Sequence, residues 1–132
     1  MVKQKKDTNK STKDLVKAII EGLHKKKGKE VVSLDLSELE NSVCKYFVIC
    51  HADSDRQVEA LAHSVLETAQ EETGEKAWHK EGLDNATWVL LDYSDVVVHI
   101  FQKEYRDLYK LEDLWADAKL IEHEDISNKK EN

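Results

Sequence analysis

Residues 87–101 read TWVLLDYSDVVVHIF, two apolar runs rich in β-branched and aromatic residues that are separated by Ser94 and Asp95. Both runs have the composition and length of β-strands. Because a connection this short joins only antiparallel neighbours, the segment predicts a β-hairpin. Such a loop often needs a positive φ angle, which costs serine about 1 kcal/mol more than glycine.

Three further segments indicate strands upstream of the hairpin. The run YFVIC at residues 46–50 is apolar throughout and flanked by polar residues, which is typical of a central strand buried on both faces. The alternating run VVSLDL at residues 31–36 predicts a half-buried strand, and residues 76–79 predict a short edge strand.

Apolar residues at helical spacing predict three helices. The first covers residues 11–27, with Ser11 and Asp14 as a capping pair and Gly28 as its stop. The second covers residues 55–72 between Ser54 and Gly74, and the third covers residues 111–118. Helices that alternate with strands and a hairpin imply an α/β fold, a mixed β-sheet of about five strands with helices packed on it.

The chain has 132 residues, the length of one domain. We place that domain at residues 11–120, after a disordered lysine-rich segment at 1–10 and before a polar tail at 121–132. No apolar run approaches the roughly 20 residues of a membrane span, and the start lacks a secretory signal, so we expect a cytoplasmic protein with no membrane contact. Cys44 and Cys50 should be reduced thiols, since they lie about 20 Å apart along an extended chain.

Charge is divided unevenly along the chain. Residues 1–29 contain ten lysines and three acidic residues, whereas residues 30–132 contain 24 acidic and ten basic residues. An acidic body is repelled by phosphate backbones and attracted to basic proteins, so we expect no DNA binding and little or no direct RNA contact. The lysine-rich N-terminal segment could make weak contacts with RNA, but a solvated tail is the better interpretation.

Three stretches of the sequence occur together in a recognisable order. They are KYFVIC at 45–50 with Ser54 and RQV at 56–58; Trp78, Glu81-Gly82 and WVLLDY at 88–93; and DVVVHIF at 95–101 with Arg106, Tyr109, Leu111-Glu112, Leu114-Trp115 and Ala118. The set resembles the ribosomal silencing factor (Iojap) family over about residues 12–120. Ala52 and Ser94 stand where the family usually has glycine, which affects the expected geometry of two turns.

The resemblance implies a nucleotidyltransferase-like fold without catalytic residues, cofactor or metal. It also implies that the protein docks onto a basic ribosomal protein on the intersubunit face of the large ribosomal subunit. Bound there, it would block association with the small subunit and repress translation under nutrient limitation. A homodimer formed through the hairpin edge or the last helix is a further possibility.

Candidate partner-binding residues fall in the second and third stretches. They are Trp78, Glu81, Gly82, Tyr109, Leu111, Glu112, Leu114 and Trp115. Aromatic and aliphatic side chains anchor interfaces, and Glu112 with Asp113 would supply an acidic rim. The alternative for Leu111, Leu114 and Trp115 is packing of the last helix onto the sheet. For Trp88 and His99 we favour the core, with His99 hydrogen-bonded.

An enzyme of the nucleotidyltransferase type is the main alternative. Asp53 and Asp55 follow one predicted strand and Asp92 and Asp95 flank the end of another, and converging carboxylates are what two Mg²⁺ ions require. Against this, no glycine occurs between residues 29 and 73 to form a triphosphate-binding turn, and the acidic body has no basic cluster. A protein-binding adaptor unrelated to ribosomes is a third possibility.

Overall fold

One mixed β-sheet organises the computed structural model, which describes residues 8–124. The strands are β1 (Lys29–Asp35), β2 (Tyr46–Ala52), β3 (His79–Glu81), β4 (Trp88–Asp92), β5 (Val96–Gln102) and β6 (Lys119–His123). Their order across the sheet is β3-β4-β5-β2-β1-β6. The α/β fold predicted from sequence is confirmed, with six strands instead of about five. Of the segments expected to flank the domain, residues 8–10 belong to a helix and residues 121–123 to a strand, whereas residues 1–7 and 125–132 lie outside the described residues.

The parallel pair β2–β5 forms the centre of the sheet, and every other neighbouring pair is antiparallel. Phe47 to Ala52 are all buried, which confirms the prediction of a central strand from the YFVIC run. The hairpin of β4 and β5 is confirmed as well. Ser94 in its loop has a φ of 77°, the positive value expected there, and its N–H donates to Oδ1 of Asp92 at 2.7 Å.

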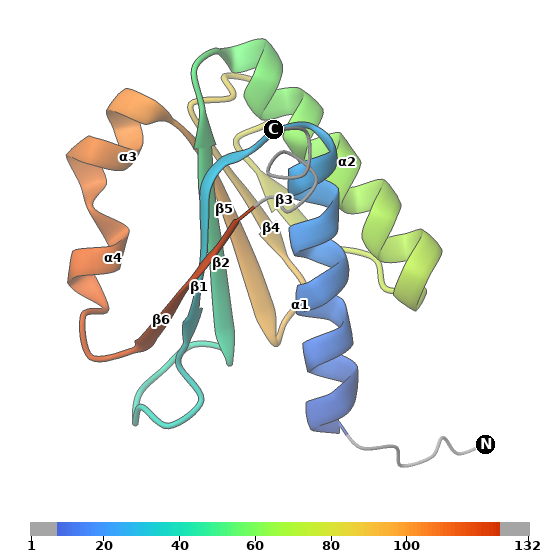
Figure 1. Cartoon of the computed structure of the whole chain (residues 1–132), viewed down its shortest axis with the longest axis vertical. Helices are drawn as coiled ribbons and strands as arrows, with labels where there is room; N and C mark the ends of the chain where they lie inside the picture. The colour runs from blue at the N-terminus through green and yellow to red at the C-terminus, as the bar shows by residue number, and fades with distance from the viewer. Residues whose placement is uncertain (1–7, 125–132) are drawn as a thin grey trace.

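Two long helices cover one face of the sheet: α1 (Thr8–Lys25) and α2 (Asp55–Thr73) (Figure 1). Ser54 caps α2 by accepting the N–H of Gln57 at 3.2 Å, and Gly74 ends the helix with a left-handed backbone, both as predicted. The capping pair at Ser11 is wrong, because the chain is already helical from Thr8. Neither helix, nor any other in residues 8–124, is long and apolar enough to cross a membrane.

The opposite face carries two short helices, α3 (Lys103–Tyr109) and α4 (Leu111–Leu114) (Figure 1). A single helix over residues 111–118 is therefore wrong. Lys110 adopts a left-handed backbone (φ 48°) between α3 and α4, and the chain leaves helical geometry at Trp115 (φ −111°, ψ 43°). Strand β6 follows, so the folded domain extends beyond residue 120.

Strand β6 was missed because its sequence gives little strand signal. It pairs only with β1 at the sheet edge, and four of its five side chains are exposed. Leu120 and Ile121 are adjacent in sequence and point to opposite faces, so they create no apolar alternation. Cys44 and Cys50, as expected, are free thiols.

Gly82 has a structural function in the loop between β3 and β4. Its φ is 84°, and a Cβ added there would lie only 2.1 Å from the carbonyl oxygen of Trp88. Gly74 has a similar φ of 77°, but nothing lies within 4 Å of its hypothetical Cβ. Substitutions at Gly74 and Gly82 therefore distinguish the cost of backbone strain from the cost of a steric clash.

We therefore predict that Gly74→Ala lowers the free energy of unfolding by about 1 kcal/mol, from backbone strain alone. Gly82→Ala should lower it by about 3 kcal/mol or more, because the loop must also move away from β4. Urea denaturation of both variants measures the difference. Equal losses would contradict the close approach at Gly82.

Candidate docking surface

A layer of aromatic rings lies on the sheet face beneath α3 and α4. The ring of Phe47 packs edge-on against His99 at 4.6 Å and against Trp115 at 5.7 Å between centroids. The ring of Trp88 contacts Phe101 at 5.0 Å and Tyr109 at 4.8 Å between centroids, tilted by 30° and 42°. The short helices are thus attached to the sheet by aromatic contacts, as the core assignment of Trp88 anticipated.

Several large apolar side chains remain uncovered around this layer. Exposed fractions reach 71% for Trp78, 73% for Val43 and 74% for Leu114, and Leu108 and Tyr109 are also exposed. Trp78 and Val43 share a cavity with Phe47, so they lie at the same sheet face as α4. We call the five residues Val43, Trp78, Leu108, Tyr109 and Leu114 the apolar surface.

The predicted partner-binding residues separate into exposed and buried groups. Trp78, Glu81, Tyr109 and Leu114 are exposed, and the carboxylate of Glu81 lies 2.6 Å from Nε2 of His79. Leu111 is wrong as a surface anchor, because only 8% of it is accessible and it packs in the core with Phe47 and Phe101. Trp115 is only partly exposed, and its ring packs against Phe47.

Glu112 also has an internal role instead of the acidic rim that we expected. Its Oε2 accepts hydrogen bonds from Nε of Arg106 at 3.0 Å and from Nη2 of the same guanidinium. Arg106 is buried, at 7% exposure. A buried cation requires a counterion and filled donors, so Glu112 is committed to the fold.

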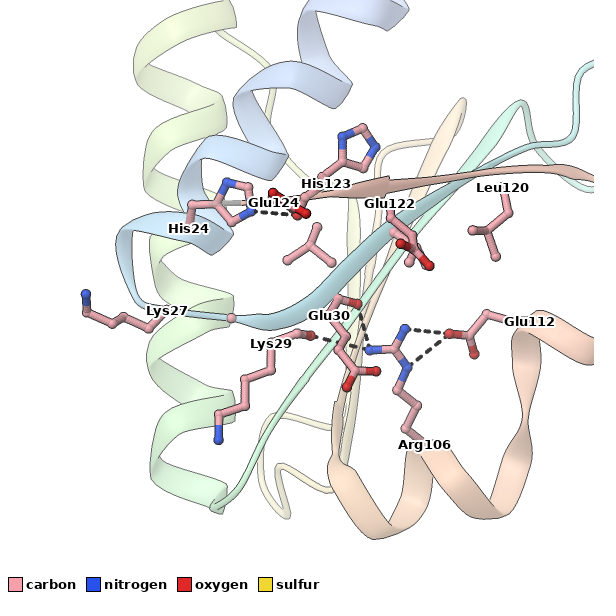
Figure 2. A pocket seen from close by; sticks show the side chains of 13 residues that line it. His24, Lys27, Lys29, Glu30, Arg106, Glu112, Leu120, Glu122, His123 and Glu124 are labelled. Atoms are coloured by element: carbon pink, nitrogen blue, oxygen red, sulfur yellow. Dashed lines mark hydrogen bonds and ion pairs between the residues drawn. The ribbon is translucent and has the colours of Figure 1, made fainter. Parts of the chain in front are cut away.

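The guanidinium of Arg106 joins four elements, and Figure 2 shows its contacts with Glu112, Glu30 and Lys29. From α3 it reaches Glu112 at the start of α4, and its Nη1 donates to the carbonyl oxygen of Glu30 at 2.9 Å and, more weakly, to that of Lys29 at 3.4 Å. Nη1 also donates to Nδ1 of His51 on β2 at 2.9 Å. We call this set of contacts the arginine clamp.

Backbone geometry in β1 prepares the clamp. The register of β1 against β2 shifts between Lys29 and Val32, and Glu30 has a φ of 49°. A bulge of this kind turns carbonyl groups out of the ladder, where Arg106 receives them. Sequence reasoning missed the clamp, although Arg106 was among the residues carrying the family resemblance, because its partners on β1 and β2 are more than 50 residues away in sequence.

A cavity of about 1050 Å³ opens beside the clamp, at the edge of the sheet between β1 and β6 (Figure 2). Its rim has charges of both signs, including Lys27, Lys29, Glu122 and Glu124. The donors of Arg106 are directed to Glu112, to backbone and to His51, so they are not arranged to bind an anion.

His99 is the hydrogen-bonded core histidine that the sequence suggested. Nε1–H of Trp88 donates to its Nδ1 at 3.1 Å, so in the neutral ring the proton is on Nε2. Nε2 is buried and has no hydrogen-bond partner among the described residues. Burial lowers the pKa of His99 to about 4, so the imidazole is neutral at physiological pH.

The four carboxylates of the enzyme alternative do not converge. Asp53 follows the end of β2, whereas Asp95 precedes β5 beside the start of β2, so the strand of about 20 Å separates them. Asp53 pairs with Lys29 at 2.6 Å, and Asp95 accepts a hydrogen bond from Thr12 at 3.1 Å. Within residues 8–124, no three metal-ligating side chains are grouped to hold an ion.

The fold and this surface define a mixed α/β domain with exposed apolar side chains on one face, and comparison with known proteins gives the family. The model described as "Ribosomal silencing factor during starvation" matches residues 9–132. A ribosomal silencing factor of Halalkalibacterium halodurans is 39% identical over 116 residues, covering 88% of this chain and 97% of the relative. That of Bacillus subtilis is 40% identical over 110 residues, covering 83% and 92%.

A solved structure agrees with these matches. The crystal structure of a protein from Chromobacterium violaceum superposes with a TM-score of 0.74 at 39% identity, covering 79% of this chain and 85% of that one. The chain therefore belongs to the ribosomal silencing factor family.

We predict that Glu112→Ala lowers the free energy of unfolding by about 2–4 kcal/mol, because Arg106 is left buried without its counterion. Asp113→Ala changes the neighbouring exposed carboxylate and should cost no more than about 0.5 kcal/mol. Thermal and urea denaturation measure both variants. Similar losses would mean that the ion pair contributes little to folding.

His99 should make stability depend on pH. The unfolded chain binds its proton near pH 6.5 and the folded chain only near pH 4, so the unfolded state holds more protons in between. Stability contributed by His99 is complete above about pH 6.5 and is lost as the pH falls toward 4, by about 1 kcal/mol per pH unit.

The measurement compares the wild type with His99→Gln, which keeps an acceptor for Trp88, by urea denaturation between pH 7 and about pH 5. The wild type should lose stability more steeply than the variant. If the unfolding free energies of wild type and variant change with pH in parallel, His99 has the same pKa in the folded and unfolded chains.

Proposed function

We propose that this chain silences translation by binding a basic ribosomal protein on the intersubunit face of the large ribosomal subunit. There it occupies space that the small subunit needs, so the two subunits cannot join. The activity would serve cytoplasmic ribosomes when nutrients are limiting. The observation that carries the proposal is the apolar surface, exposed on a member of the ribosomal silencing factor family.

The composition of this surface supports a protein partner. Trp78, Tyr109 and Leu114 are large side chains of the kinds that fill pockets across an interface. Grouped exposed apolar residues of this kind mark interaction sites more often than inert surface. The core beneath them is complete, so their exposure is not needed for folding.

Charge supports a basic partner. Exposed acidic residues lie on or just after α3 and α4: Glu104, Asp107, Asp113 and Asp117. Two exposed lysines, Lys103 and Lys110, lie on this side as well, and Lys103 pairs with Asp107 at 2.8 Å, but the acidic residues outnumber them. Other lysines lie on α1, which covers the opposite face of the sheet (Figure 1). A neighbour rich in lysine and arginine would complement the α3–α4 side electrostatically.

The proposed mechanism is steric and requires no chemistry. A factor that binds the free large subunit but not the joined ribosome shifts the equilibrium toward separate subunits by mass action. Light scattering of purified large and small subunits tests this directly. Increasing amounts of the protein should reduce subunit association to near zero, and unchanged association at a saturating dose would reject the proposal.

We predict that Trp78→Ala and Leu114→Ala each weaken binding to isolated large subunits by about tenfold or more, because each removes an exposed anchor. Neither should change the unfolding midpoint appreciably, since both side chains are more than two-thirds exposed. Co-sedimentation through sucrose gradients measures binding. Glu71→Ala, on the exposed side of α2, is the matched control and should bind normally.

A further inference from the structure

A second cavity, of about 360 Å³, opens on the apolar surface near the end of β4. Its lining is Val43, Phe47, Trp78, Leu90, Asp92, Ser94, Val97 and His99. Most of the wall is aliphatic or aromatic. Among the described residues that line it, only Asp92 has a formal charge at neutral pH.

We infer that this cavity receives an arginine side chain of the ribosomal partner, with the guanidinium on the Trp78 ring and paired with Asp92. The inference rests on the proposed function, because it concerns the basic protein proposed there. It adds the chemistry of one contact to that general proposal.

Asp92 is held ready for such a contact. Its Oδ1 accepts the N–H of Ser94 at 2.7 Å, which fixes the carboxylate within the hairpin loop. Oδ2 has no hydrogen-bond partner within residues 8–124, so it remains available to an incoming donor. A charged donor that meets a partly buried carboxylate forms a stronger bond than a neutral one.

Trp78 supplies the surface for the planar part of the guanidinium. The residue lines the cavity and is 71% exposed, so it is accessible to a partner side chain. Arginine stacks on tryptophan through cation–π attraction and dispersion, and its aliphatic stem can pack on Leu90 and Phe47. Lysine lacks the flat group that stacks in this way.

The surroundings of the cavity favour a cation. His99 is neutral, because burial holds its pKa near 4, so it does not repel positive charge. The thiol of Cys44 has its pKa raised to about 11, chiefly by burial, with Asp92 and Asp95 adding to the effect. Those two carboxylates therefore make the local potential negative.

The first experiment is an NMR titration of the ¹⁵N-labelled full chain with N-acetyl-arginine amide. N-acetyl-citrulline amide, which has nearly the same shape without the charge, is the comparison ligand. The indole N–H signal of Trp78, assigned with Trp78→Phe, should shift saturably with arginine, and citrulline should bind at least about fivefold more weakly. Equal shifts with both ligands, or none with either, would overturn the inference.

The same titration of the Asp92→Asn variant tests whether the charge of Asp92 causes the preference for arginine. Asparagine keeps an oxygen for the Ser94 N–H and removes only the charge, so it should abolish the preference for arginine over citrulline. Asp84→Asn removes an exposed charge from the β3–β4 loop, outside the lining of the cavity, and should leave the preference intact. A preference that survives in Asp92→Asn would contradict the assigned role of Asp92.

The second experiment measures binding of the same variants to isolated large subunits. Asp92→Asn should weaken binding by about tenfold, and Asp84→Asn should not. If the wild type co-sediments with large subunits and Asp92→Asn does so equally well, the inference fails and the proposed function stands. If the wild type does not co-sediment, the proposed function fails, and the titration alone decides whether the cavity accepts arginine.

Discussion

The guanidinium of Arg106 holds α3 and α4 in position on the face of the sheet opposite α1 and α2. It is buried, yet it meets a carboxylate, two backbone carbonyl groups and an imidazole nitrogen. Those contacts attach α3 and the start of α4 to the bulged end of β1 and to β2. Two helices of seven and four residues have too few side chains to hold such a position by apolar packing alone, so the polar clamp compensates.

Because the clamp holds α3 and α4 in place, the rest of that face remains open. The other face is covered by two helices of 18 and 19 residues, whose apolar sides match the width of the sheet. The short helices cannot match that cover, and Trp78, Val43 and Leu114 are left at the surface. The two faces therefore differ: long helices cover one, and large apolar side chains are exposed on the other.

The sequence predicted the centre of the fold better than its C-terminal part. YFVIC, the hairpin runs and the Ser54 cap are local signals, because a buried strand, a tight turn and a helix start each depend on adjacent residues. Arg106 is different, since three of its partners come from β1 and β2, and Glu112 is committed to the fold through Arg106. Trp78 and Leu114 could be proposed as partner-binding residues from their side-chain type, but only the fold shows that both are exposed, that Leu111 is buried and that Glu112 pairs with Arg106.

The parallel pairing of β2 with β5 has a consequence for how the chain folds. β1 with β2, and β4 with β5, are antiparallel neighbours close in sequence and can form early, each closing a short loop. Tyr46 and Val96 are far apart in sequence, and they meet only when these two local units dock edge to edge. Docking of the units, with its larger loss of chain entropy, is therefore the natural kinetic barrier, and the sheet should acquire native order cooperatively at that step.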